Sequence, residues 1–148
     1  MRCFFDTNVL VYAEISSSQH HKRARQLLVH LAEGAAAWAI PWPCIYEFLR
    51  VVTHPRVYHP PVPRDIALQD LRNVLASPSV LLLSETPRHH EVMEEVVQQS
   101  GVTGNLIHDA HIVALCLEHG VSELHTGDRD FARFAGIKFT DPFASPVS

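Results

Sequence analysis

Short apolar runs alternate along this chain with longer segments in which apolar residues recur at helical spacing, and this alternation strongly constrains the fold. The expected strands cover residues 3–5, 37–40, 80–83, 121–125 and 137–139. The expected helices cover residues 9–13, 20–33, 44–52, 64–75, 88–99, 105–119 and 128–134. Strands that alternate with helices form a parallel sheet covered on both faces. The sequence therefore predicts an α/β protein with three layers, α/β/α, around a sheet of about five strands.

The chain has 148 residues, of which 47% are hydrophobic, and is long enough to bury one core. We therefore expect residues 1–148 to form a single domain. There is no apolar run of about eighteen residues, and Asp6 follows the first apolar run before a signal sequence could form. These features predict a soluble, cytoplasmic protein that binds no membrane. The three cysteines lie far apart and are predicted to be buried, reduced thiols: Cys3, Cys44 and Cys116.

Four carboxylates stand where this pattern would bring them to one edge of the sheet: Asp6, Glu47, Asp109 and Asp128. Asp6 directly follows the first strand, and Asp128 follows the fourth. Glu47 and Asp109 lie early in their helices, and the N-terminus of a crossover helix lies at the carboxyl ends of the parallel strands. The sequence therefore predicts that the four acids meet at that edge.

A cluster of four carboxylates demands a bound cation, because acidic side chains cost least when they are dispersed in water. Mg²⁺ and Mn²⁺ prefer such oxygen ligands, and an ion held in this way suits phosphodiester hydrolysis. The formal net charge of −4 does not exclude a polyanionic partner, because a bound divalent ion reverses the local charge. Each acid taken singly could be a turn, N-cap or solvated helix residue. The four together favour a functional site.

Four segments that contain these acids resemble, in order, the motifs of PIN-domain ribonucleases: residues 4–10 (FFDTNVL), 47–53 (EFLRVVT), 108–112 (HDAHI) and 126–131 (TGDRDF). The resemblance is strongest to VapC-type toxins of bacterial toxin–antitoxin systems and covers nearly the whole chain. It implies one PIN domain with a parallel sheet of order 3-2-1-4-5, and a magnesium- or manganese-dependent endoribonuclease. It also implies inhibition by a cognate VapB-type antitoxin, and a homodimer.

The resemblance assigns catalytic roles to the four acids. Asp6, Asp109 and Asp128 match the acids that hold metal. Glu47 completes the quartet, and its role is left open between a metal ligand and a residue that orients the attacking water. The resemblance therefore predicts three metal ligands and one carboxylate of undecided role.

Three further residues are expected to support the quartet. Thr126 matches the small hydroxyl residue that supports the acids in the family, and Asn8 is expected to hold Asp6 by a hydrogen bond. Asp130 lies two positions after Asp128. It could support the metal ligands without binding the ion itself, or it could only stabilise the N-terminus of a helix as an acid in its first turn.

Two residue types could contact RNA. Arg129 is the preferred cation because it adjoins Asp128, although many arginines in such positions are salt-bridged or solvated. Trp38 is expected in the core, whereas Trp42 is left open between core packing and stacking on an unpaired base.

The histidines suggest a different site, because His108 and His111 flank Asp109 as in zinc or HD-type phosphohydrolases. The predicted helix around Asp109 lies between strands, whereas an HD-type site belongs on an all-helical fold, so histidine ligation is disfavoured. His108 and His111 could still approach RNA. The adjacent pairs His20-His21 and His89-His90 are expected on the solvated surface.

Two other functions remain open from the residues alone. One is a catalytically silent PIN-like domain that binds RNA or a protein partner. The other is a metal-dependent phosphatase for small substrates. RNA binding without cleavage would support the first, and activity on phosphomonoesters but not on RNA would support the second.

Overall fold

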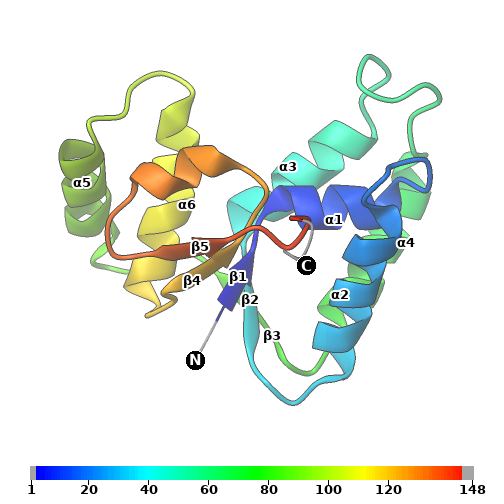
Figure 1. Ribbon diagram of the computed structural model, residues 1–148, viewed down its shortest axis with the longest axis horizontal. Coiled ribbons are helices and arrows are strands. Elements are labelled where there is room, and N and C mark those ends of the chain that lie inside the picture. Colours follow the sequence, from blue (N-terminus) through cyan, green and yellow to red (C-terminus); the bar gives the residue numbers. More distant parts are fainter. Residues whose placement is uncertain (1–2, 145–148) are drawn as a thin grey trace.

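A computed structural model describes residues 3–144 of the chain (Figure 1). Its strands form one parallel sheet in the order β3-β2-β1-β4-β5. The strands are β1 (Cys3–Phe5), β2 (Trp38–Pro41), β3 (Val80–Leu83), β4 (Glu123–His125) and β5 (Lys138–Thr140). The predicted fold class and strand order are both confirmed.

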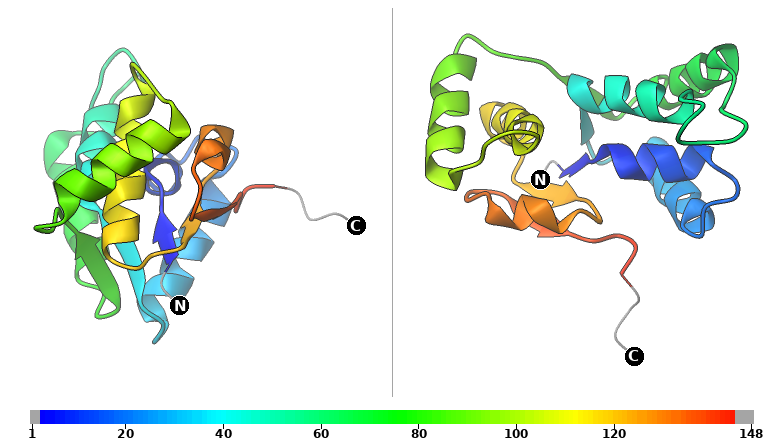
Figure 2. Two further views of the ribbon diagram at one scale, coloured as in Figure 1. Left: turned by 90° about the vertical axis from the view of Figure 1, so that its left-hand side faces the viewer. Right: turned by 90° about the horizontal axis from the view of Figure 1, so that it is seen from above.

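Helices connect these strands on both faces of the sheet. They are α1 (Thr7–Glu14), α2 (His21–Glu33), α3 (Trp42–Val52), α4 (Arg64–Leu75), α5 (His89–Ser100) and α6 (Leu106–Glu118), with a 3₁₀ helix η1 (Arg129–Arg133). Helices α1 to α4 lie on one side, and α5, α6 and η1 lie on the other (Figure 2, right). Right-handed crossovers require this division, because the strand order reverses direction between β3 and β4.

The reversal leaves β1 and β4 as neighbours whose connections leave on opposite faces of the sheet. In open α/β sheets, ligands bind at such a switch point, outside the carboxyl ends of the strands. The topology therefore places any ligand site near the residues that follow β1 and β4.

The core lies on both faces of the central strands. Phe4, Trp38, Ile40 and Leu124 are completely buried. The indole N–H of Trp38 donates a hydrogen bond to Ser79 Oγ at 3.2 Å, so the buried polar atom has a partner. The prediction of Trp38 as a core residue is confirmed.

Two of the three cysteines are buried, free thiols, as predicted: Cys44 and Cys116. The side chain of Cys3 lies outside the described part of the structure. Helix α3 begins at Trp42, two residues before the expected start, and its second residue is Pro43. Proline is well accommodated there, because the first turn of a helix has no acceptor for its missing N–H. Within residues 3–144, no helix combines the length and apolar character that a membrane span requires.

Gly101 ends α5 in the left-handed conformation, with φ 68° and ψ 18°. Gly101→Ala should lower the free energy of unfolding by about 1 kcal/mol, because a Cβ is strained in that conformation. Gly101→Asn should lose less of this free energy, since asparagine tolerates the left-handed conformation better than alanine does. Urea unfolding of the two variants measures the difference, and equal stability of the alanine variant and the parent would contradict the explanation.

Candidate active site

Asp6 is held at the carboxyl end of β1 by two hydrogen bonds. Its Oδ1 accepts from the backbone N–H of Thr7 at 2.8 Å, which caps the N-terminus of α1. Its Oδ2 accepts from the hydroxyl of Thr126 at 2.8 Å. The two side chains meet because Phe5 pairs with His125 in the β1–β4 register, so the next residue of each strand leaves the sheet at the same point.

The hydroxyl of Thr126 also organises Asp128. Thr126 is completely buried, and its Oγ1 accepts a hydrogen bond from the backbone N–H of Asp128 at 2.9 Å. The carboxylate of Asp128 in turn accepts from the N–H of Asp130 at 2.9 Å and caps η1. One hydroxyl therefore links two acids that lie 122 positions apart in the sequence. This geometry is consistent with the supporting role expected for Thr126.

All four predicted acids line a single cleft of about 760 Å³: Asp6, Glu47, Asp109 and Asp128. Asp109 reaches it from the first turn of α6, and Glu47 from the second turn of α3. The expectation that the acids share one edge of the sheet therefore agrees with the structure. Their roles in catalysis remain a prediction.

Two aspartates in the cleft, Asp6 and Asp109, have a raised pKa. Burial raises the pKa of Asp6 from 3.8 to about 6, although its hydrogen bonds oppose the change and the charges of Asp128 and Glu47 add to it. Burial likewise raises the pKa of Asp109 to about 6, with three neighbouring aspartates contributing. A bound cation would offset the cost of ionising both buried carboxyl groups. The donor set is made of oxygens alone, which fits a hard divalent ion such as Mg²⁺ or Mn²⁺.

Asp130 lies close enough to join this site. One carboxylate oxygen each from Asp109, Asp128 and Asp130 lie within 4.8 Å of one another. Asp130 also contacts Arg133 at 3.4 Å, across one turn of η1. Asp130 therefore belongs to the first turn of η1 and also lies near Asp109 and Asp128, and its part in a metal site remains a prediction.

Glu47 differs from the three aspartates because it already has a cationic partner. Arg50 Nη2 lies 2.6 Å from Glu47 Oε1, and 46% of the Glu47 side chain is exposed. Arg50 is the one lysine or arginine among residues 3–144 that lines the cleft. The sequence had favoured Arg129 as the cation that contacts RNA. The signal that could have selected Arg50 is its position three residues after Glu47, which places it on the same face of α3.

The other predicted site residues take different positions. Asn8 lines the cleft, but the hydrogen bonds described for Asp6 come from Thr7 and Thr126, so the expected bond from Asn8 is not observed within residues 3–144. Arg129 is exposed at the start of η1 and is not one of the residues that line the cleft. Its contact with RNA remains a prediction.

Three histidines of α5 and α6 lie in the cleft or are partly buried, whereas the sequence placed adjacent histidine pairs at the surface. His108 and His111 line the cleft beside Asp109. His89 was expected on the solvated surface, but only 23% of its side chain is exposed, and its Nδ1 lies 2.6 Å from the buried carboxylate of Glu118. The expectation is wrong for His89 because α5 packs against α6, which turns this residue inward. Its neighbour His90 has 83% of its side chain exposed, as expected.

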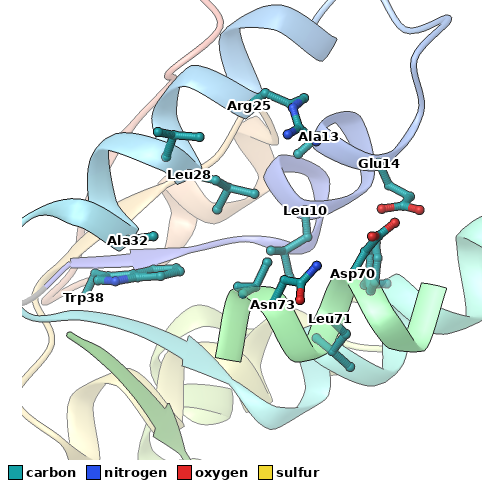
Figure 3. A pocket seen from close by; sticks show the side chains of 13 residues that line it. Leu10, Ala13, Glu14, Arg25, Leu28, Ala32, Trp38, Asp70, Leu71 and Asn73 are labelled. Carbon is teal, nitrogen blue, oxygen red and sulfur yellow. The ribbon is translucent and has the colours of Figure 1, made fainter. Parts of the chain in front are cut away.

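A second cavity, of about 250 Å³, lies between α2 and α4 beside α1 (Figure 3). Its lining is mostly apolar and includes Leu10, Leu28 and Trp38. The carboxyl groups of Glu14 and Asp70 point toward each other at its edge (Figure 3). Burial raises the pKa of Glu14 to about 7, with further contributions from the hydrogen bond to Asp70 and from its charge. No sequence spacing indicates this pair, because its partners lie on separate helices.

The sheet order and the acidic cleft at its switch point together fit a metal-dependent nuclease. Residues 3–137 match the family model described as PIN domain. The chain is 34% identical over 140 residues to Ribonuclease VapC48 of Mycobacterium tuberculosis, which covers 95% of this chain and 97% of that protein. It is also 34% identical over 137 residues to Ribonuclease VapC37 of the same species, covering 93% of this chain and 94% of that protein. The chain therefore belongs to the VapC ribonucleases of the PIN-domain family.

Solved structures agree on the fold. VapBC2 from Rickettsia felis, bound to a DNA fragment from its promoter, superposes with a TM-score of 0.68 at 19% identity, over 95% of this chain and 98% of that one. VapC20 of Mycobacterium tuberculosis, described as a sarcin-ricin loop cleaving toxin, gives a TM-score of 0.63 at 16% identity, over 91% of this chain and 98% of that one. At these identities the likeness extends to the fold alone.

The raised pKa of Asp6 makes stability depend on pH. Its folded pKa of about 6 lies above the ordinary 3.8, so its protonated form favours folding below about pH 4, and this stability is lost as the pH rises through 6. The full shift corresponds to about 3 kcal/mol. Without divalent metal, Asp6→Asn should therefore be about 1–3 kcal/mol more stable than the parent near pH 8, with a smaller gain near pH 4.

Urea unfolding in EDTA at the two pH values measures this gain. Added Mg²⁺ should stabilise the parent more than the variant, because an ion neutralises the buried carboxylate. If Asp6→Asn were less stable than the parent at pH 8, the carboxylate would not be under electrostatic strain.

Proposed function

We propose that this chain is the endoribonuclease toxin of a toxin–antitoxin pair, and that it cleaves RNA phosphodiester bonds with Mg²⁺ or Mn²⁺ as cofactor. The observation that carries the proposal is the convergence of four acids, from positions far apart in the sequence, on one cleft at the switch point of the sheet. Relatives named as ribonucleases support the choice of RNA as the substrate. One domain would then carry the whole activity.

Asp6, Asp109 and Asp128 would hold the metal, with Asp130 close to the last two. A bound divalent ion supplies charge stabilisation at the phosphoryl group and a more acidic water. Thr126 and the backbone of Thr7 fix the orientation of Asp6, so that its carboxylate needs no rearrangement on binding.

The other two groups in the cleft would act on water and on RNA. Glu47 lies partly exposed in the cleft and would accept the proton of the attacking water, or orient that water, once Arg50 has released it. Arg50 would then exchange its contact with Glu47 for a phosphate of the RNA, which its planar guanidinium binds well. Substrate binding and the release of Glu47 would thus occur together.

A VapB-type antitoxin is the partner proposed for this toxin. The support is the fold shared with solved VapBC assemblies, those of Rickettsia felis and of nontypeable Haemophilus influenzae among them. We also propose a homodimer in the cytoplasm, where RNA substrates are present. Large apolar side chains that are exposed are consistent with contacts between subunits or with an antitoxin. They include Trp42, Tyr46, Val57 and Ile66.

Asp6→Asn should reduce RNA cleavage at least about 100-fold, because the amide cannot replace a buried anionic metal ligand. EDTA should abolish cleavage by the parent, and Mg²⁺ or Mn²⁺ should restore it. Gel analysis of RNA fragments measures both effects. Asp65→Asn is the matched control, because Asp65 is a 93% exposed acid in the first turn of α4, away from the cleft.

Full cleavage by Asp6→Asn, or by the protein in EDTA, would overturn the proposal. Metal-independent RNA binding without cleavage would indicate a silent binding module instead. Hydrolysis of phosphomonoesters without cleavage of RNA would indicate a phosphatase.

Arg50→Ala should raise KM for RNA about fivefold, equivalent to about 1 kcal/mol, because it removes the cation that lines the cleft and leaves Glu47 without its partner. Arg129→Ala should have a smaller effect, since Arg129 lies outside the cleft lining. Cleavage kinetics at several RNA concentrations compare the two variants. A larger loss in Arg129→Ala would favour the original prediction from the sequence.

A further inference from the structure

Three side chains outside the acidic quartet form a second group with metal-ligand chemistry. Glu85 lies in the segment between β3 and α5, His89 is the first residue of α5, and His111 lies on α6. One ligand atom from each lies within 4.8 Å of the other two. Their rings and carboxylate are already in contact, because His111 Nε2 lies 2.9 Å from Glu85 Oε1 and the two imidazole centroids are 5.4 Å apart.

A buried carboxylate sets the orientation of His89. Glu118, whose side chain is 0% exposed, lies 2.6 Å from His89 Nδ1. The same carboxylate accepts hydrogen bonds from the backbone N–H and the hydroxyl of Thr86, at 3.0 and 2.8 Å. Glu118 therefore fixes Nδ1 as the protonated nitrogen and leaves the lone pair on Nε2. A carboxylate bound to the far nitrogen of a histidine is the usual second partner of a metal-ligating imidazole.

The three ligand atoms need only small shifts in their separations to hold an ion. Ligands of tetrahedral zinc, at about 2.0–2.1 Å from the metal, lie about 3.4 Å apart. The present separations are 4.8 Å or less. Side-chain rotations of Glu85, which is 51% exposed, and of His111, which is 34% exposed, can adjust the three ligand atoms to that spacing. His89 is anchored by Glu118, so the two more exposed ligands are the ones that move.

We propose that Glu85, His89 and His111 form a transition-metal site that takes Zn²⁺, separate from the acidic cleft. Two imidazoles and one carboxylate are a known ligand set for zinc, with a fourth position open to water. Mg²⁺ prefers oxygen ligands in octahedral geometry, so the two sites differ in the ion that they select.

The site joins three segments and adjoins the cleft. Zinc bound there links the β3–α5 segment and α5 to α6, the helix that carries Asp109. His111 also lines the cleft, so the ion lies at its rim. Zinc therefore stiffens one wall of the cleft and adds positive charge there, whatever reaction the cleft performs.

Calorimetric titration with Zn²⁺ in excess Mg²⁺, which occupies the carboxylate cleft, tests the proposal. The parent should bind one Zn²⁺ ion, and His89→Ala and His111→Ala should each weaken this binding at least about tenfold. Glu85→Gln should also weaken it, and this change keeps an exposed side chain of similar shape. His90→Ala, which changes an adjacent exposed histidine, should bind as the parent does.

Two further measurements are independent of RNA cleavage. Zn²⁺ should raise the Tm of the parent in excess Mg²⁺ but not that of Glu85→Gln. Co²⁺ used as a spectroscopic probe should give the strong visible absorption of a four-coordinate site with nitrogen ligands. Unchanged Zn²⁺ affinity in the two histidine variants and in Glu85→Gln would overturn the proposal, and the contacts would then be ion pairs only. Loss of Zn²⁺ binding in Asp6→Asn alone would also overturn it, by assigning the ion to the acidic cleft.

Discussion

The hydrogen bond from Thr126 to Asp6 is the contact on which the site depends. It joins the residue after β1 to the residue after β4, at the point where the sheet reverses its order. The same hydroxyl accepts from the backbone of Asp128. Because Thr126 is completely buried, water cannot replace either contact, and one side chain fixes the relative positions of the two acids.

The carboxylates of the cleft lie close together and are partly buried, which costs folding free energy when they are ionised. Asp6 and Asp109 both have a pKa near 6, so the empty site works against stability at neutral pH. The surrounding structure tolerates this because the central strands bury a large apolar core, and hydrogen bonds orient the carboxylates before any ion arrives. Functional sites commonly combine groups that the rest of a protein keeps apart, and binding of a cation would offset the repulsion here.

The sequence predicted the architecture and the convergence of the four acids on one cleft. Alternating apolar runs fix the strands, and chain direction alone sends Asp6 and Asp128 to one edge of the sheet. Contacts between side chains on separate helices were not predictable, because no sequence spacing reports them. The partnership of His89 with Glu118 depends on how α5 packs against α6, and that of Glu14 with Asp70 on how α1 lies beside α4. Arg50 lies within one of the four motifs, three residues after Glu47, and this spacing could have marked it as the cation of the cleft. Arg129 was preferred instead because it adjoins Asp128.

The strand order also has a consequence for synthesis on the ribosome. Asp6 acquires its Thr126 partner only when β4 has emerged and paired with β1, because the two residues lie 120 positions apart. Asp128 follows Thr126 by two positions. A nascent chain therefore has an incomplete set of acids until β4 and the residues after it have been synthesised. A nuclease of this topology cannot assemble its cleft from β1, β2 and β3 alone.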